Sequence, residues 1–456
     1  MPFIPHTDAE RDEMLEAIGV TTIDALFDEV PMSLRASLPP EMPEGISEMA
    51  LMQLMQRRAK QDEMSLSFLG AGAYEHHIPA AVWDLTNRGE FLTAYTPYQA
   101  EASQGTLQLI YEFQTMIARL TALDVANASV YDGATALAEA MLMAVRANKT
   151  NKSKRIVVAG NLNPHYIAVC EAIVSNQGLV LEVLEPDEQT GTIPTDCAPQ
   201  LSEAAALVVS YPNFFGGLDP IDALTDAAAA AGALVIGVVN PTALALLKPP
   251  GQWGASGADI AVGEGQPLGI PLASGGPYLG FMCCRKAYVR QMPGRIIGRT
   301  VDQTGQPGYA LTLQAREQHI RRGKATSNIC TNQGLLVTAA TLYLSLLGDE
   351  GLRQVALKSH AGINQLVAAA GQIEGVSRRF SGPVFHEQVL QLPVPAADVV
   401  NLMANEGILP GLALGALWAP MANCLLVNVT ETKTSDDIDH FVTHLANAIE
   451  AIKSTC

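Results

Sequence analysis

A chain of 456 residues is too long for one hydrophobic core, so we expect two or three domains. Hydrophobic residues make up 48% of the chain and charged residues only 16%, a composition that excludes an intrinsically disordered protein. The formal net charge of −18 argues against nucleic acids and anionic membrane surfaces as partners, because a polyanion repels both.

The sequence also predicts a protein without a membrane span, a disulfide framework or a metal site. The longest apolar stretch, residues 227–239, is far shorter than the roughly 20 residues that cross a bilayer. Residues 1–6 show neither a basic region before an apolar run nor an Arg-rich leader. The seven cysteines are odd in number and lack the C-x-x-C spacing of zinc sites. We therefore expect a cytoplasmic protein with reduced cysteines.

Residues 1–70 have the pattern of an N-terminal helical arm. Thr7 and Asp8 can cap a helix that continues to Ile18, and a second helix is predicted at residues 47–62. A proline-rich crossing separates the two helices. We expect this arm to pack on a larger body, since it has too few apolar residues for a core of its own.

Residues 71–330 have the pattern of a large α/β domain. Apolar residues recur at helical spacing over residues 107–120. Short runs that are apolar on both faces, separated by helical stretches, are typical of a buried and mainly parallel sheet. These runs lie at residues 156–159, 179–184, 205–210, 233–239 and 258–262. We therefore predict a doubly wound sheet.

Residues 331–456 have the pattern of a smaller C-terminal α+β domain. Four helices and two strands are expected, because the apolar spacing alternates between the two periods. The helices are predicted at residues 333–347, 351–370, 396–406 and 435–452, and the strands at residues 388–392 and 424–429.

A dense polar loop precedes the helical pattern at residues 107–120. Tyr95, Tyr98, Gln99 and Glu101 surround Pro97, whose ring stiffens the backbone that presents them. So many hydrogen-bonding groups favour the wall of a polar pocket. The alternative is a surface loop in which Ser103 caps the following helix.

Two adjacent histidines, His76 and His77, follow a run of small residues at positions 70–73. They could serve in proton transfer or in contact with an anion. Adjacent side chains point in different directions, so joint binding of a metal by this pair is not expected. The alternative is one buried and one exposed histidine.

Asp132 lies just before the helix predicted at residues 136–147, and two roles are possible for this helix start. The amides at the start of a helix form an anion site, which often holds a cofactor phosphate in this fold class. Asp132 is also a good helix cap and would then occupy those amides itself. The cap is the favoured interpretation.

The strongest basic concentration in this acidic chain lies between residues 285 and 324. Such a stretch could attract a carboxylate, a phosphate or an acidic partner protein. The alternative is a solvated charged helix. The residues of its densest part are Arg316, His319, Arg321, Arg322 and Lys324.

Taken together, these stretches resemble the P-protein family of the glycine cleavage system, glycine dehydrogenase (decarboxylating), and in particular its α chain (subunit 1) of the two-gene form. The resemblance implies the fold of pyridoxal-phosphate (PLP) dependent transferases of fold type I and an α2β2 heterotetramer. It also implies decarboxylation of glycine at PLP and transfer of the aminomethyl group to the lipoyl-lysine of H-protein. The wider system adds T-protein and L-protein. The similar segments are residues 70–79, 95–105, 132–142, 211–216, 263–269, 288–294 and 316–331.

The resemblance further implies that this chain lacks the catalytic lysine. Where catalytic relatives carry the Schiff-base lysine, this chain reads Gln266-Pro267, and no lysine occurs between Lys248 and Lys286. The aspartate that holds the ring nitrogen of PLP corresponds to Asn240, which carries no charge. We therefore expect PLP on a partner β subunit and no catalytic residue here.

The same resemblance gives the polar segments roles in a shared site. Tyr95, Tyr98, Gln99 and Glu101 would reach toward the partner's cofactor pocket, with His76 and His77 nearby. The basic stretch at residues 316–324 would shape the approach of H-protein. Gly323 departs from the family, which usually has an acidic residue there.

Two alternatives stay open at this point. One is an autonomous PLP-dependent decarboxylase that uses Lys248 or Lys286, although Lys248 precedes two prolines and Lys286 follows Arg285 in a charged pair. The other is a non-catalytic scaffold subunit that contributes nothing to the pocket.

Overall fold

A computed structural model describes residues 5–36, 41–62, 66–92, 94–273 and 275–455. The chain divides into two compact units, Met1–Glu63 and Met64–Cys456. The second unit includes both residues 71–330 and residues 331–456, and the three domain boundaries proposed from the sequence stay predictions.

The first unit contains the two helices that the sequence predicts. Helix α1 (Asp8–Ile18) begins at Thr7, whose hydroxyl accepts a hydrogen bond from the Glu10 amide while the Glu10 carboxylate accepts one from the Thr7 amide. This reciprocal pair satisfies amides that would otherwise lack partners. Helix α2 (Glu48–Gln61) begins at Ser47, which caps the Ala50 amide.

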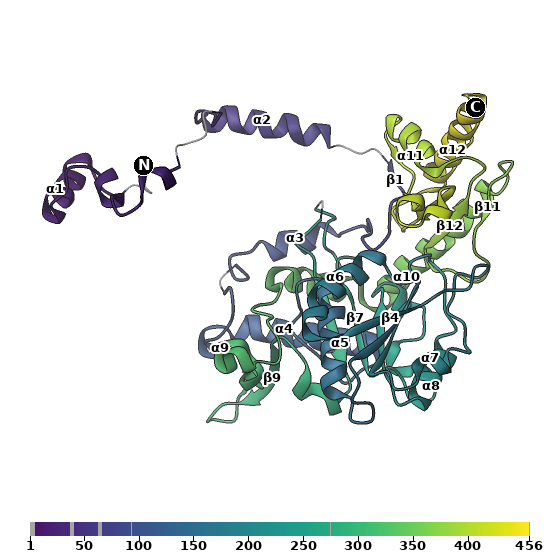
Figure 1. Ribbon diagram of the computed structural model, residues 1–456, viewed down its shortest axis with the longest axis horizontal. Coiled ribbons are helices and arrows are strands. Elements are labelled where there is room, and N and C mark those ends of the chain that lie inside the picture. The colour runs from purple at the N-terminus through teal and green to yellow at the C-terminus, as the bar shows by residue number, and fades with distance from the viewer. Residues whose placement is uncertain (1–4, 37–40, 63–65, 93, 274, 456) are drawn as a thin grey trace. The chain divides into compact units, whose positions relative to one another are not determined.

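The second unit is built on a seven-stranded sheet, of which Figure 1 labels β4 and β7. The strand order is β2-β8-β7-β6-β5-β3-β4. Strands β3 to β7 pair in parallel, and β8 and β2 add an antiparallel edge. All five predicted strands are confirmed. The strands are β2 (Val125–Ala126), β3 (Arg155–Ala159), β4 (Val180–Leu184), β5 (Ala206–Tyr211), β6 (Leu234–Val239), β7 (Ile260–Glu264) and β8 (Gly280–Cys284).

Helices cover both faces of this sheet, as expected for a doubly wound fold. Alternate strand residues point to opposite faces. Val158 and Val208 pack with the side chains of α5 and α6, whereas Val157 and Val209 pack with those of α4, α8 and α10. Both faces are therefore buried, which explains why the strands are apolar at every position.

Among the described residues of the second unit, ten α-helices are found. They are α3 (Ala80–Thr86), α4 (Gln104–Thr121), α5 (Gly133–Ala147), α6 (Pro164–Val174), α7 (Ala198–Leu201), α8 (Ile221–Ala230), α9 (Gln318–Arg321), α10 (Gly334–Ala370), α11 (Ala396–Asn405) and α12 (Ser435–Thr455). Helix α10 breaks at Gly348, where φ is 60° and ψ is −166°, so that it consists of the two helices predicted from the sequence.

Helix α10 is also long and apolar enough to cross a membrane by length and composition alone, the one such helix in the part of the chain described. Its apolar residues have other partners. Val337 and Tyr343 are buried in the core of the large sheet, and Ile363 and Leu366 are buried in the core of the smaller sheet. The helix therefore joins two cores of a globular body.

The smaller sheet lies near the C-terminus and has the order β11-β12-β15-β14. It consists of β11 (Ser377–Arg378), β12 (Glu387–Gln391), β14 (Leu412–Ala413) and β15 (Cys424–Asn428). Figure 1 shows α11 and α12 grouped beside it. The strands predicted at residues 388–392 and 424–429 are confirmed, and β12 brings Glu387 to the edge of the large sheet, as described below.

The sequence pattern missed several elements. The edge strand β8 and the antiparallel hairpin of β9 (Ile296–Val301) and β10 (Pro307–Thr312) were not predicted. Two further short strands, β1 (Leu66–Ser67) and β13 (Ile408–Leu409), pair in parallel. The alternative of one charged helix in the basic stretch is wrong, because residues 314–324 form a 3₁₀ turn, the four-residue α9 and a second 3₁₀ turn.

Candidate functional site

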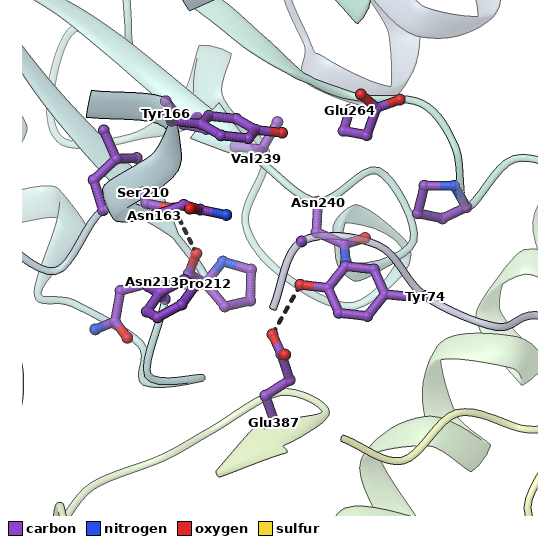
Figure 2. Close-up of a pocket in the computed structure, with 15 residues that line it drawn as sticks. Tyr74, Asn163, Tyr166, Ser210, Pro212, Asn213, Val239, Asn240, Glu264 and Glu387 are labelled. Atoms are coloured by element: carbon purple, nitrogen blue, oxygen red, sulfur yellow. Dashed lines mark hydrogen bonds between the residues drawn. The ribbon is translucent and has the colours of Figure 1, made fainter. Parts of the chain in front are cut away.

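A small cavity lies at the carboxyl edge of the large sheet, the place where ligands bind in open α/β folds (Figure 2). Asn240 follows β6 directly, Glu264 is the last residue of β7, and Glu387 enters from β12. About 70 Å³ is open to water-sized molecules. The lining also includes Gly72, Tyr74, Leu162, Asn163, Tyr166, Ser210, Pro212, Asn213, Phe214, Val238, Val239 and Pro267.

Two carboxylates of the chain itself occupy the amides at the start of α5. Asp132 accepts a hydrogen bond from the Thr135 amide at 2.8 Å, and Glu264 accepts one from the Gly133 amide at 3.0 Å. The favoured interpretation of Asp132 as a helix cap is thereby confirmed. An incoming phosphate would have to displace both anions, because the amides and the positive end of the helix dipole are already used.

Glu387 ties the loop before α3 to the cavity. Its carboxylate accepts hydrogen bonds from the Ala71 amide at 2.7 Å and from the Tyr74 hydroxyl at 2.8 Å. Figure 2 shows the second of these bonds. Burial raises the pKa of Glu387 to about 7, and burial likewise raises the pKa of Glu264 to about 7.

Asn240 is held by its own turn and lies beside a neutral histidine. Its side-chain oxygen accepts hydrogen bonds from the Thr242 and Ala243 amides, and its nitrogen lies 3.3 Å from His386 Nε2. Burial and the nearby His76 hold the pKa of His386 well below its usual range. Asn240 therefore offers no negative charge to a protonated pyridine ring.

The residues of this cavity do not fit PLP. No lysine is among the described residues that line it. Pro267, which the resemblance places where catalytic relatives have the lysine, lines the cavity. The preceding Gln266 is buried and its side chain is fully hydrogen-bonded, because its amide nitrogen donates to the Tyr74 and Ile270 carbonyls and its oxygen accepts from the Tyr74 amide.

The two alternative lysines lie elsewhere. Lys248 forms a surface ion pair with Asp222, at 2.8 Å, and Lys286 is exposed at the start of a 3₁₀ turn. Neither residue lines the cavity. The geometry gives no support to an autonomous PLP enzyme.

The cap at α5 can be tested by mutation. We expect Asp132→Ala to lower the free energy of unfolding by about 1 kcal/mol, because the Thr135 amide loses its acceptor. Asp132→Asn keeps a side-chain oxygen that can accept from the Thr135 amide, so its free energy of unfolding should fall by only a few tenths of the loss in Asp132→Ala. Thermal unfolding of the two variants, compared with wild type, measures both values, and equal losses would contradict a capping role.

The two predicted histidines have different environments. His76 is buried, and its Nδ1 lies 2.7 Å from a carboxylate oxygen of Glu431. His77 is exposed, and its amide donates to the other oxygen of Glu431. The alternative of one buried and one exposed histidine is confirmed. Neither lines the cavity, although His76 is close enough to His386 to affect its pKa.

The predicted pocket-wall loop lies outside the cavity. Tyr95 is 81% exposed and Tyr98 is 52% exposed, and Gln99 and Glu101 are also exposed. Ser103 makes no side-chain capping bond to α4. The four side chains are therefore presented outward, and their role in a shared pocket wall stays a prediction.

The structure joins this loop to the basic stretch. The rings of Tyr98 and His319 meet edge to face with centroids 5.4 Å apart. Beneath them, Arg295 donates a hydrogen bond to the Tyr98 hydroxyl at 2.9 Å. Two segments predicted as separate sites thus form one surface.

The other predicted docking residues differ in exposure. Arg316 is half-buried and donates to the Leu313 and Gly294 carbonyls, so that it supports the local backbone. Arg321, Arg322 and Lys324 are exposed. Their part in docking stays a prediction.

Sequence reasoning gave no site role to three residues of this region, although Arg295 lies within the basic concentration at residues 285–324. Glu264 lies in a segment already singled out at residues 263–269, and its position at the end of a predicted strand was an available signal. Glu387 and Arg295 reach their partners across more than 190 residues of chain, and no local pattern marks such contacts.

Comparison with known proteins gives consistent results over nearly the whole chain. The family model described as glycine cleavage system P-protein matches residues 1–445. A protein named probable glycine dehydrogenase (decarboxylating) subunit 1 from Nitrosomonas europaea is 57% identical, over 99% of this chain and 100% of its own. One of the same name from Alcanivorax borkumensis is 58% identical, over 97% and 98%.

Solved structures agree with the fold. A crystal structure of glycine decarboxylase (P-protein) of the glycine cleavage system, in inhibitor-bound form, matches with a TM-score of 0.87 and 41% identity, over 98% of this chain and 100% of its own. Glutamate decarboxylase from Lactobacillus brevis matches at 0.67 with 13% identity, over 92% and 96%, which indicates a shared fold alone. The predicted fold type I architecture is confirmed, and the chain belongs to the P-protein family of the glycine cleavage system.

Proposed function

We propose that the chain is the PLP-free α subunit of a two-chain glycine dehydrogenase (decarboxylating). The observation that carries this proposal is the cavity at the sheet edge, where Gln266-Pro267 stands in place of a histidine and a lysine and Glu264 fills the anion site at α5. The relatives named subunit 1 support a second chain, since that name implies a partner. The partner β subunit would hold PLP through its own lysine.

We further propose that the pair decarboxylates glycine at the partner's PLP and passes the aminomethyl group to the lipoyl-lysine of H-protein. The residues of this chain would complete the pocket from outside. Tyr95 and Tyr98 are exposed donors on a loop stiffened by Pro97, which suits a wall that closes a neighbour's site. The assembly would be an α2β2 heterotetramer that works with T-protein and L-protein.

The exposed cations Arg321, Arg322 and Lys324 support an acidic partner, and we assign them to the approach of H-protein. We also propose a cytoplasmic location. The six cysteines with described side chains are free thiols, which suits a reducing compartment.

Absorbance and exchange measurements test the proposal. After incubation with PLP and removal of the unbound cofactor, the chain purified alone should be colourless and should not exchange bicarbonate carbon into glycine. The chain co-purified with its β subunit should be yellow and active. Pro267→Lys should also stay colourless alone, because Asp132 and Glu264 still occupy the α5 amides. PLP bound covalently to the isolated wild-type chain would refute the assignment.

The scaffold alternative needs a separate experiment. In the co-purified pair, the double variant Tyr95→Phe, Tyr98→Phe keeps both rings and removes both hydroxyls. A lower exchange rate with intact assembly would support the pocket wall, and an unchanged rate would favour a pure scaffold.

A further inference from the structure

An arginine is buried beneath the exposed loop that carries Tyr98. Arg295 stands immediately before β9, and only 3% of its surface is exposed. Burial of a guanidinium is costly unless its charge and its N–H groups find partners. The partners of Arg295 therefore indicate what the burial achieves.

Those partners are a tyrosine hydroxyl, a backbone carbonyl and a carboxylate. Nη2 of Arg295 donates to the Tyr98 hydroxyl at 2.9 Å and to the Cys330 carbonyl at 2.6 Å. Nε lies 3.7 Å from a carboxylate oxygen of Glu317, which is itself largely buried. The carboxylate balances the charge, and the strong directional bonds go to Cys330 and Tyr98.

The bond to Tyr98 fixes the direction of the phenolic proton. A guanidinium has donors and no acceptor, so the Tyr98 oxygen must accept from Arg295. Its own proton is then left for another acceptor, and Arg295 is its one hydrogen-bonding partner among the described residues. Since Tyr98 is 52% exposed, that acceptor can come from outside the chain.

The ring of Tyr98 is fixed as well. The Arg295 guanidinium carbon lies 5.4 Å from the ring centroid, and the His319 ring packs edge to face against the same ring. Two side chains thus hold an exposed tyrosine in one orientation. If the Tyr98 hydroxyl had no binding role, fixing this exposed side chain would add little to the stability of the fold.

We infer that Arg295 is a positioning residue that aims the Tyr98 hydroxyl, as a hydrogen-bond donor, at an anionic oxygen of the substrate bound in the partner's pocket. The inference rests on the proposed function. The ligand class follows from the chemistry: a phenolic donor backed by a cation suits a carboxylate oxygen, which glycine carries.

A double-mutant cycle in the co-purified pair tests this coupling. Tyr98→Phe and Arg295→Met should each lower kcat/KM of glycine–bicarbonate exchange about tenfold, the scale of one hydrogen bond. The double variant should be no slower than Tyr98→Phe alone, because Arg295 acts through Tyr98. Arg299→Met, an exposed arginine on β9, is the matched control and should leave the rate unchanged.

The outcomes separate the inference from the proposed function. An equal loss from Arg295→Met in the wild-type and Tyr98→Phe backgrounds would show that Arg295 acts independently, and would overturn the inference. No loss in Tyr98→Phe would remove Tyr98 from the site, while the PLP absorbance of the pair tests the subunit assignment separately. If Arg295→Met does not assemble, Arg295→Lys keeps a charge for Glu317 but lacks the planar fork, and the same non-additivity is expected.

Discussion

Gly216→Ala should lower the free energy of unfolding by roughly 3 kcal/mol or more. Gly216 has φ of +85°, where only glycine is unstrained. A Cβ atom at this position would also lie 2.0 Å from the Glu387 carbonyl oxygen and 2.5 Å from its carbon. The Glu387 backbone belongs to β12, so relieving this clash would require β12 to shift, which costs free energy. Thermal unfolding of the purified variant measures the loss.

Gly305→Ala is the matched control for this prediction. Gly305 has φ of +84° in the turn between β9 and β10, and nothing lies within 4 Å of a Cβ built there. Its loss should therefore be only the strain of the left-handed conformation, about 1 kcal/mol. Equal losses at the two glycines would show that β12 does not press against Gly216, and would contradict the close contact.

The sequence predicts local elements, but it does not predict long-range contacts such as the one between Gly216 and Glu387. The strands of the large sheet follow from apolar runs, because a strand buried on both faces has a local signature. Helices α1, α2 and α5 follow from their caps at Thr7, Ser47 and Asp132. The hairpin of β9 and β10 was missed because few of its residues are fully buried and they lack a regular apolar alternation.

The candidate site was predictable only in part, for the same physical reason. The missing lysine and the neutral Asn240 could be read from the sequence through its resemblance to catalytic relatives, since both positions follow predicted strands. The side-chain contacts that line the cavity could not be predicted from the sequence, because the hydrogen bond between Glu387 and Tyr74 joins residues 313 positions apart. The bond between Tyr98 and Arg295 spans 197 positions and depends on how β9 packs under the loop.

Glu387→Gln should remove the loss of stability that Glu387 causes as pH rises. The folded chain raises the pKa of Glu387 from 4.5 to about 7 through burial, although the Ala71 amide and the Tyr74 hydroxyl oppose the shift. Between these values the folded state holds a proton that the unfolded state has released, so the free energy of unfolding falls as pH rises from 4.5 to about 7. The full shift corresponds to roughly 3 kcal/mol.

Glutamine stays neutral, and it can still accept from the Ala71 amide while its nitrogen donates to the Tyr74 oxygen. Relative to wild type, the free energy of unfolding of the variant should therefore rise by roughly 3 kcal/mol between pH 4.5 and about pH 8, as measured by unfolding midpoints across that range.

Glu431→Gln is the control, because the pKa of Glu431 is shifted in the opposite direction. Burial raises the pKa of Glu431, but bonds from His76 and the His77 amide outweigh burial and leave the pKa lowered, so its stabilisation is present above pH 4.5 and is lost on acidification. A pH profile of Glu387→Gln parallel to that of wild type would mean that Glu387 is ionised in the folded chain throughout, and that its two donors hold the negative charge against burial.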